Sequence, residues 1–323
     1  MPELPEVQTT VNGLSHTIVG LRIDDVWSDY NSPYFKGADN IKNPRYFDVF
    51  RKKILNKKVL SVSRRAKNIL IHLEGGLTML IHMKMTGHLL FGRYEFRPVN
   101  KSGAKISPWI PISPESLKDP FNRHIHFVLT FKKGAERIQG AQNHLALCDS
   151  RKFAKVTLID SAKLHDSIHI KDLGPEPLEK SFTFEKFVER LNTKSHWKIK
   201  LALMDQTVMA GIGNIYADES LWRAEIHPME LVSNISKVKM LALFKAIKQT
   251  LERGIDFGGD SMSDYRNVHG ERGKFQEQHR AYQKTGEKCS KKGCRGTIRR
   301  IVVGTRGTHY CDKHQVLSSR KAR

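Results

Sequence analysis

The sequence predicts an α+β protein in which a β-rich first half is followed by a helical second half and a metal-held hairpin. Short runs rich in β-branched and aromatic residues fill the first half, and many alternate between apolar and polar side chains, which is typical of strands. Beyond residue 177 the apolar residues recur at helical spacing. Three of the four cysteines lie beyond residue 288. We therefore expect a sandwich or flattened barrel, then a helical domain and a small cysteine-containing module.

The first half begins with a short amphipathic helix predicted over residues 3–15, with Pro5 in its first turn. Five strands are predicted after it, over residues 59–63, 69–73, 77–83, 125–131 and 156–159. Two stretches, residues 30–48 and 92–122, interrupt this pattern. Because they hold many Pro, Gly, Asn and Ser residues, we interpret them as surface insertions.

The second half begins after the hinge-like sequence GPEP at residues 174–177. Helices are predicted over residues 183–193, 198–208, 214–224 and 235–253. Residues 257–277 are rich in Gly, Asp, Ser and Arg, and we interpret them as a mobile loop. The last residues are basic and are expected to be disordered.

The charge of the chain predicts a polyanionic partner. Lysine and arginine number 55 against 33 aspartate and glutamate residues, a formal net charge of +22. Such an excess favours nucleic acid, and anionic membrane is second because no long amphipathic basic helix is evident. The chain has no apolar segment of about 18 residues and no signal peptide, so we expect a soluble, intracellular protein without a membrane span. A basic surface without a dedicated partner is the alternative.

The cysteine segment predicts a structural zinc site. Three cysteines and one histidine follow one another at short spacing: Cys289, Cys294, Cys311 and His314. Three thiolates and one imidazole suit tetrahedral Zn²⁺, and a closed set of four protein ligands is typical of a structural site. The pattern differs from that of a secreted disulfide scaffold. His309 is the rival fourth ligand, although the spacing after Cys311 favours His314.

The residues between the ligand pairs predict a hairpin. Two strands are joined by a tip at residues 304–307, from which Arg306 would project. A basic hairpin of this kind suits a DNA groove, and a stabilising clip with a solvated arginine is the alternative.

The N-terminus carries a candidate nucleophile. Pro2 is small enough for Met1 to be removed, which would leave a secondary amine at the start of the chain. An α-amino group has a pKa of about 8, well below that of a lysine side chain, so more of it is neutral near neutral pH. A neutral amine can attack an electrophilic carbon and form an iminium, and Glu3 beside it can carry protons. A processed terminus without chemistry is the alternative.

Other segments carry side chains suited to DNA. A Gly-rich turn ends at Asn214, where the backbone and the next helix's N–H groups can approach a phosphate. Lys67 and His82, at strand ends, can pair with phosphates. Arg151 beside the aromatic ring of residue 153 can fill a gap in a base stack, and Met85 can act as another wedge. Taken singly, each of these is better explained by a core or surface role.

Taken in order, these segments resemble the formamidopyrimidine-DNA glycosylase and endonuclease VIII family. The resemblance covers nearly the whole chain except the two insertions and rests on MPELPEV, RRAK, HMKMTG, DSRKF, LMDQTVMAGIGNIYADESL, IHP and the terminal hairpin GTRGTHYC. RRAK, MTG and the hairpin are nearer to the formamidopyrimidine branch. The resemblance implies an N-terminal β-sandwich flanked by helices, a C-terminal helix–two-turn–helix domain and a zinc-finger β-hairpin.

The domain boundaries follow from this resemblance. The first domain is expected over residues 1–160 and a linker over 161–180. The expected remainder is a helix–two-turn–helix domain at 181–284 with a lesion-capping loop at 257–277, a zinc finger at 285–316 and a basic tail at 317–323.

The resemblance implies a base-excision-repair enzyme, both glycosylase and abasic-site lyase, that flips oxidised bases out of double-stranded DNA. It implies that Pro2 is the nucleophile, that Glu3 moves protons, and that Lys67 completes the catalytic set and grips a phosphate. β- and δ-elimination would follow. The residues that it implies in DNA binding are Glu6, His82, Met85, Arg151, Lys152, Phe153, Asn214 and Arg306.

The chain departs from the family pattern in several places. The first cysteine pair is separated by four residues rather than two, and His314 stands in place of a cysteine. Lys152 stands where arginine is usual, which keeps the charge but loses the bidentate fork, and Ala154 stands where glycine is usual. Residues 264–276 occupy the position of the loop that closes over a flipped oxidised purine, which favours 8-oxoguanine and formamidopyrimidines.

Two alternatives stay open. One is an endonuclease VIII-like specificity for oxidised pyrimidines, and the other is a non-catalytic, zinc-dependent DNA-binding relative. A monomer is expected because no oligomerisation motif is evident.

Overall fold

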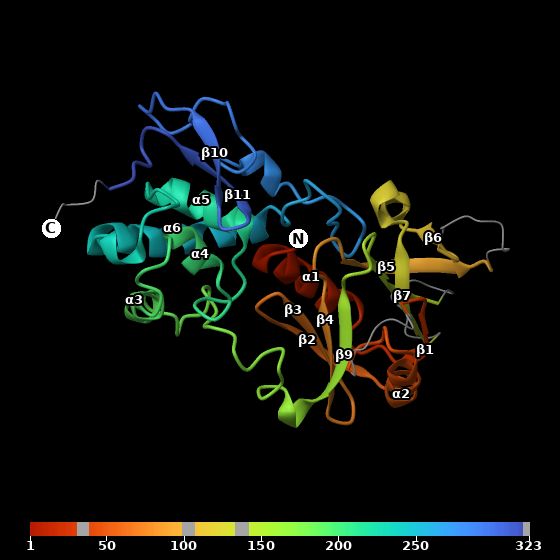
Figure 1. The fold of residues 1–323 in the computed structure, drawn as a ribbon. Coiled ribbons are helices and arrows are strands. Elements are labelled where there is room, and N and C mark those ends of the chain that lie inside the picture. The colour runs from red at the N-terminus through yellow and green to blue at the C-terminus, as the bar shows by residue number, and fades with distance from the viewer. Residues whose placement is uncertain (31–38, 99–106, 133–141, 319–323) are drawn as a thin grey trace. The chain divides into compact units, whose positions relative to one another are not determined.

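The computed structural model describes residues 1–30, 39–98, 107–132 and 142–318; parts of both predicted insertions and the end of the basic tail lie outside the described residues. The chain divides into two compact units, shown in Figure 1: Met1–Lys171 with Phe257–Lys274, and Asp172–Asp256 with Phe275–Arg323. The segment Phe257–Lys274 therefore belongs by its contacts to the first unit, whereas the sequence assigned it to the helical domain.

The first unit is a sandwich of two antiparallel sheets (Figure 1). The larger has the order β1-β7-β8-β5-β6, with β1 Ile23–Ser28, β5 His88–Phe96, β6 Trp109–Ser113, β7 Ile125–Phe131 and β8 His144–Cys148. The smaller has the order β2-β3-β4-β9, with β2 Val59–Arg65, β3 Asn68–Leu73, β4 Leu77–His82 and β9 Lys155–Asp160. Apolar side chains from both sheets, such as Ile71 and Phe127, are fully buried in one core. The predicted sandwich is confirmed.

Helix α1, Leu4–Thr17, packs against β2, β3 and β5. Glu3 and Glu6 form a capping box that satisfies free N–H groups at its start. Pro5 is tolerated in the first turn because an N–H at that position would make no hydrogen bond within the helix. Its core-facing side chains recur every three or four residues, as a helix requires: Leu4, Val7, Val11 and Leu14.

The two predicted insertions contain more regular structure than the sequence indicated. Helix α2, Pro44–Ile54, starts in the first, behind the capping side chain of Asn43. In the second, β5 continues to Phe96, β6 pairs with it, and two short 3-10 helices follow, η1 Glu115–Lys118 and η2 Pro120–Asn122. Because Pro111 is typical of loops, the sequence did not predict β6 as a strand. Proline is tolerated there because β6 is an edge strand.

The second unit carries four α-helices in its described residues: α3 Phe184–Asn192, α4 Ile199–Met204, α5 Asn214–Ala224 and α6 Lys237–Asp256. All four lie at predicted positions, but α4 ends short of residue 208. Its end is set by Asp205, whose side chain accepts a hydrogen bond of 2.8 Å from the Thr207 N–H and closes a turn instead. Among the residues that the structure describes, none of the helices has the length and apolar content to span a bilayer.

The C-terminal hairpin consists of β10 Ile298–Val303 and β11 Arg306–Cys311. Val303 pairs with Arg306, so the turn is the dipeptide Gly304-Thr305 and not the four-residue tip expected from the sequence. Gly304 has a φ of +61°, a conformation that suits a tight hairpin turn. Arg306 is therefore the first residue of β11, and its side chain is exposed.

Candidate functional site

The predicted nucleophile and its neighbouring acid lie at the start of α1. Pro2 and Glu3 are both buried, and Glu3 is 2% exposed. The Glu3 N–H donates to Glu6 Oε2 over 2.7 Å, and the Glu6 backbone is in turn capped by the Glu3 side chain. The N-terminus is therefore held in one conformation by the helix that it starts.

Lys67 lies in the two-residue turn that joins β2 to β3. Arg64 connects this turn to α1, because its Nε donates to Gln8 Oε1 over 3.0 Å and its Nη1 donates to the Ala66 carbonyl over 2.9 Å. Lys67 is only 7% exposed. The hairpin that holds Lys67 is thus bonded to α1 at Gln8, and Arg64, which makes this contact, is a residue that the sequence did not single out.

His82, at the end of β4, is neutral at physiological pH. Burial, together with the charges of Lys84 and Lys67, lowers the pKa of His82 to about 3. Its Nδ1 accepts a hydrogen bond of 3.0 Å from the Lys84 N–H, which places the ring proton on Nε2. A contact between His82 and a phosphate would therefore use a neutral N–H donor and not a positive charge.

Asp149 organises the two loops that carry the predicted wedge residues. It is fully buried, and its carboxylate accepts hydrogen bonds from Thr86 Oγ1 (2.5 Å), the Tyr30 hydroxyl (3.0 Å) and the Ala154 N–H (2.7 Å). Thr86 follows Met85 in the β4–β5 loop. Asp149 itself lies in the β8–β9 loop, so one carboxylate joins both loops.

The three wedge side chains come from these joined loops. The guanidinium of Arg151 lies over the ring of Phe153 at 4.5 Å from its centroid. Phe153 is 48% exposed. Lys152 has a φ of +54°, and its Nζ lies 3.4 Å from Asp29 Oδ2. Exposed aromatic and basic side chains on a pinned loop are suited to insertion into a base stack.

The segment Phe257–Lys274 is fastened to α1. The Asp260 N–H donates to Glu6 Oε1 over 2.8 Å, and the Tyr265 hydroxyl donates to the Glu6 carbonyl over 3.0 Å. Val268 is buried in the sandwich core, and its carbonyl accepts from the Phe91 N–H over 2.6 Å. Glu6, predicted to contact DNA, thus has internal partners at the start of α1 and in this segment. The segment, predicted as a mobile loop, is tied down at several points.

In the second unit, Asn214 and the hairpin are brought together. Asn214 is the first residue of α5, and its Nδ2 donates to the Gly307 carbonyl over 3.0 Å, next to Arg306. The preceding Gly-rich turn is held by Gln206, which accepts from the Gly211 N–H and donates to the Ile212 carbonyl. The predicted phosphate-binding turn and the predicted basic hairpin therefore form one surface.

A buried ion pair between Lys200 and Asp218 supports the surface formed by Asn214 and the hairpin. Lys200 Nζ lies 2.5 Å from Asp218 Oδ1 and donates to the Asn214 carbonyl over 2.8 Å, and both charged side chains are fully buried. Asp218 Oδ2 accepts from the His309 N–H over 2.9 Å. Because His309 also places its Nδ1 3.2 Å from Asp218, it is engaged away from the cysteines and is not the fourth ligand. Sequence reasoning missed this pair because its members are 18 residues apart with no recognisable motif.

The four predicted metal ligands form one cluster. The Sγ atoms of Cys289, Cys294 and Cys311 and a ring nitrogen of His314 all lie within 4.8 Å of one another. Cys294 Sγ is 3.6 Å from Cys311 Sγ and 3.5 Å from His314 Nδ1. Tetrahedral zinc with bonds of about 2.3 Å to sulfur and about 2.0 Å to nitrogen requires separations of about 3.5–3.8 Å. His314 Nε2 donates to the Trp222 carbonyl over 3.2 Å, which leaves Nδ1 for a metal.

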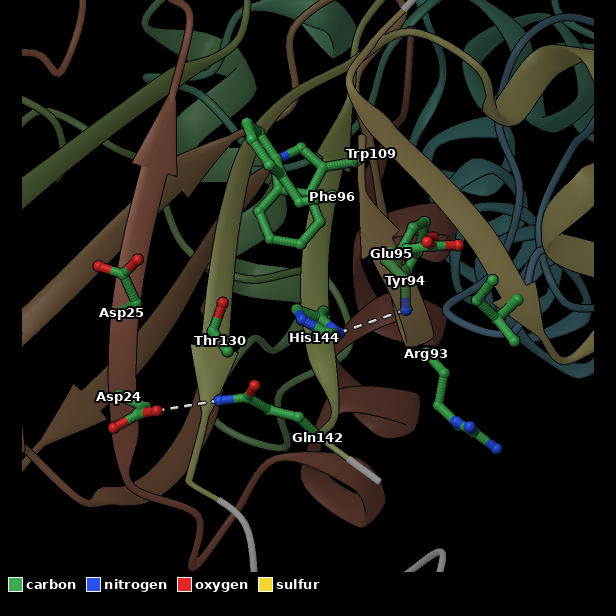
Figure 2. A pocket seen from close by; sticks show the side chains of 11 residues that line it. Asp24, Asp25, Arg93, Tyr94, Glu95, Phe96, Trp109, Thr130, Gln142 and His144 are labelled. Atoms are coloured by element: carbon green, nitrogen blue, oxygen red, sulfur yellow. Dashed lines mark hydrogen bonds between the residues drawn. The ribbon is translucent and has the colours of Figure 1, made fainter. Parts of the chain in front are cut away.

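A cavity of about 690 Å³ lies on the face of the five-stranded sheet opposite the core (Figure 2). Asp24, Thr130 and His144 line it, together with Phe96 and Trp109 from β5 and β6. Burial lowers the pKa of His144 to about 4, so its ring is neutral. None of the predicted catalytic or DNA-binding residues lines this cavity.

Comparison with known proteins agrees with this arrangement. A family model described as the formamidopyrimidine-DNA glycosylase N-terminal domain matches residues 1–156, and one described as the formamidopyrimidine-DNA glycosylase H2TH domain matches residues 173–266. The formamidopyrimidine-DNA glycosylase of Roseiflexus sp. (strain RS-1) is 36% identical over 318 residues, which cover 98% of this chain and 100% of the relative. That of Herpetosiphon aurantiacus is 34% identical over 316 residues, which cover 96% of this chain and 98% of the relative.

Solved structures give the same result. The complex between the Lactococcus lactis Fpg and an abasic site containing DNA has a TM-score of 0.75 and 30% identity, and the match covers 97% of this chain and 99% of that one. MutM in complex with carbocyclic 8-oxo-G containing DNA has a TM-score of 0.74 and 30% identity, with the same coverage. Family models, relatives and structures agree across both units, and the chain belongs to the formamidopyrimidine-DNA glycosylase family.

Proposed function

We propose that this chain is a bifunctional DNA glycosylase and abasic-site lyase that excises oxidised purines from double-stranded DNA. The observation that carries the proposal is the buried pair Pro2 and Glu3 at the start of α1 in a member of this family. The hairpin that holds Lys67 is bonded to the same helix through Arg64 and Gln8. Solved relatives are described in complex with DNA containing an abasic site, Fapy-dG or carbocyclic 8-oxo-G. The same DNA substrates are expected for this chain.

The chemistry depends on removal of Met1. The lone pair of the Pro2 nitrogen then attacks C1′ of the damaged nucleotide, and the glycosidic bond breaks with its electrons on the departing base. The attached nitrogen loses its proton, and opening of the sugar, with a proton delivered to its ring oxygen, gives a positively charged iminium. Glu3 is the acid that we assign to this proton transfer.

The iminium then drives strand cleavage. It withdraws electrons from the sugar and acidifies the C2′ proton, whose loss expels the 3′ phosphate in β-elimination. Loss of a further proton from C4′ expels the 5′ phosphate in δ-elimination. Lys67, nearly buried beside α1, is assigned to grip a phosphate of the damaged nucleotide during these steps.

The remaining predicted residues are assigned to holding the DNA. His82, Asn214 and Arg306 are proposed to bind phosphates, which position the duplex without reading its sequence. Met85, Arg151 and Phe153 are proposed to fill the space left by the flipped base, because extruding a base costs stacking energy that inserted side chains partly restore. The segment Phe257–Lys274 is proposed to close over the extruded purine.

One structural Zn²⁺ is proposed for the cluster of Cys289, Cys294, Cys311 and His314. The separations between their ligand atoms fit a tetrahedral ion, and the His314 tautomer is already set by the Trp222 carbonyl. The ion would fasten the base of the hairpin that carries Arg306. It supplies stability and no step of the reaction.

Borohydride trapping tests the proposal. The processed chain is incubated with duplexes that carry 8-oxoguanine, an oxidised pyrimidine or an abasic site, and borohydride reduces any iminium to a stable cross-link. We expect a cross-link on the 8-oxoguanine duplex through a peptide that begins with Pro2. Cross-linking only to the oxidised pyrimidine would contradict the purine assignment. Tight binding without any cross-link, even at the abasic site, would leave a non-catalytic DNA-binding protein.

A further inference from the structure

The buried side chain of Arg266 fastens the proposed base-capping segment. Its Nη1 donates to the carbonyls of Ser263 (3.0 Å) and Tyr265 (2.8 Å), which fixes the backbone of that segment. Its Nε lies 3.1 Å from Asp119 Oδ2, and its guanidinium lies over the ring of Phe121 at 4.6 Å. Arg266 is only 3% exposed, so its positive charge depends on these partners.

Both external partners of Arg266 come from the second predicted insertion. Asp119 precedes η2 and Phe121 lies within it. Burial raises the pKa of Asp119, but hydrogen bonds from the Phe121 N–H and from Arg266 outweigh it and lower that pKa below its usual value. The clamp is therefore a charged pair at physiological pH.

The same insertion holds the far end of the segment. Ser116 Oγ donates to the His269 carbonyl over 2.5 Å, and Asn122 Nδ2 lies 3.4 Å from the Gly270 carbonyl. Gly270 has a φ of +82°, and a Cβ there would lie 2.7 Å from the Ser116 carbonyl oxygen. Only glycine allows this close approach without displacing backbone.

The insertion is itself anchored to the sandwich. β6 pairs with β5, and Leu117 of η1 is buried in an apolar cluster with Tyr94 on the sheet face opposite the main core. Phe96 and Trp109 pack edge to face at 5.3 Å on the same face, as Figure 2 shows. The contacts that residues 109–122 make with the segment are therefore anchored in the five-stranded sheet.

Between the contact of Asp260 with Glu6 and the side chain of Arg266, a short part of the segment faces solvent. Met262 is 44% exposed, and Ser263 is also exposed. Ser150 Oγ donates to Asp264 Oδ2 over 2.7 Å, which joins this part to the loop of Arg151 and Phe153. Because both ends of this exposed part are held, residues 262–264 can contact a base without changing their conformation.

We propose that residues 109–122 are a brace that orders the segment 260–270 before DNA binds, so that capture of the damaged base loses little conformational entropy. The inference rests on the proposed function of that segment. Arg266 and Asp119 are positioning residues in this account, since they act on the base only through the backbone that they hold. The brace predicts a defect in base excision that does not extend to cleavage of a site that has already lost its base.

The test compares two reactions of the full, processed chain under single-turnover conditions. One is excision of 8-oxoguanine from a duplex, and the other is cleavage of an abasic site in the same duplex. The variants are Arg266→Met, Asp119→Asn, their combination, and Gly270→Ala, which attacks the other anchor and leaves the buried arginine in place. The control is Glu115→Gln, which removes an exposed ion pair with Lys118 in the neighbouring helix η1.

We expect each clamp variant to lose about tenfold in excision, the size associated with a lost charge-assisted hydrogen bond. Cleavage of the abasic site should change less than about twofold. The double variant of Arg266 and Asp119 should lose no more than Arg266→Met alone, since the arginine substitution already breaks the ion pair with Asp119. Hydrogen exchange of the free protein should accelerate at amides 261–270 in the variants and not in Glu115→Gln.

Two results would overturn the brace. Variants that excise 8-oxoguanine as fast as the unaltered chain would show that the brace has no role in excision. An equal fall in the rates of both reactions, together with a lower melting temperature, would show that these residues only stabilise the fold. Failure of the proposed function looks different, because the unaltered chain would then cleave neither duplex. In that case unchanged hydrogen exchange in the variants would still refute the brace, and faster exchange would support its ordering role.

Discussion

Thr86 and Asp149 share a hydrogen bond of 2.5 Å that joins the β4–β5 loop to the β8–β9 loop. The bond makes one carboxylate responsible for the positions of Met85 on one loop and Phe153 on the other. Since Asp149 is fully buried, its charge is stabilised by the donors that surround it. The proposed wedge residues Met85, Arg151 and Phe153 are therefore positioned together by one buried carboxylate, that of Asp149.

Asp149→Asn should destabilise the first unit by about 2 kcal/mol, because an amide turns one acceptor into a donor among existing donors. Thr86→Val removes the hydrogen bond to Asp149 and the weaker one that the hydroxyl accepts from the Arg151 N–H, and it should cost about 1 kcal/mol. Urea unfolding of both variants measures the difference. Equal stability of Asp149→Asn and the unaltered chain would show that the buried carboxylate does not organise the loops.

His82 should make stability depend on pH. Its folded pKa of about 3 lies below the usual value of 6.5, so the unfolded chain binds this proton more readily. The contribution is fully present above the unfolded value, and it decreases as the pH falls from 6.5 toward 3. His82→Gln should flatten this part of the profile, measured as urea midpoints at several pH values. A variant profile parallel to that of the unaltered chain would contradict the shift.

The metal site predicts one zinc ion for each chain. His314→Ala should lose the ion, and His314→Cys should retain it because a fourth thiolate also suits zinc. His309→Gln is the control, since His309 is engaged with Asp218. Native mass spectrometry counts the metal. Zinc retained by His314→Ala but lost by His309→Gln would assign the site to the other histidine.

The buried pair Lys200 and Asp218 should be costly to break from one side. Lys200→Met leaves an uncompensated carboxylate and should destabilise the second unit by about 3–5 kcal/mol. The double variant Lys200→Met with Asp218→Leu should recover part of this loss, although the His309 N–H then lacks its acceptor. The measurement is the thermal unfolding temperature of the single and the double variant, compared with that of the unaltered chain. A double variant less stable than Lys200→Met would show that Asp218 matters mainly through His309.

Arg306 should contribute one phosphate contact to DNA binding. Arg306→Ala should weaken binding at all sequences and reduce the slope of log K against log salt by about 0.9. Arg97→Ala is the matched control, because Arg97 is an exposed arginine that is already paired with Glu95 at the end of β5. Fluorescence anisotropy over a range of salt concentrations measures both. An unchanged slope for Arg306→Ala would place the side chain away from the phosphates.

Local patterns predicted the strands whose apolar residues alternate or form bounded runs, such as β3 and β7, and all four helices of the second unit. They missed β8, since its five buried residues form a short apolar run that cannot be distinguished from other buried structure. They missed β6 because Pro111 is typical of a loop.

The roles assigned to the candidate site residues stay predictions, and the sequence did not indicate the contacts that hold these residues in place. Pro2, the metal ligands and Arg306 belong to motifs that lie close together in sequence or at a terminus. Arg266 and Asp119 meet across 147 residues, and the contact between Asp260 and Glu6 spans 254. Pairings over such distances depend on how the sheets and the segment pack, which no local periodicity records.

The burial of Pro2 sets a requirement on biosynthesis. The bond between Met1 and Pro2 must be cut to free the amine, but Pro2 is enclosed once α1 packs on the sandwich. In the folded chain Met1 is 40% exposed while Pro2 is buried, so removal of Met1 before the first unit folds would reach this bond while Pro2 is still accessible. A chain that keeps Met1 would fold with the Pro2 nitrogen in a peptide bond and would lack the proposed nucleophile.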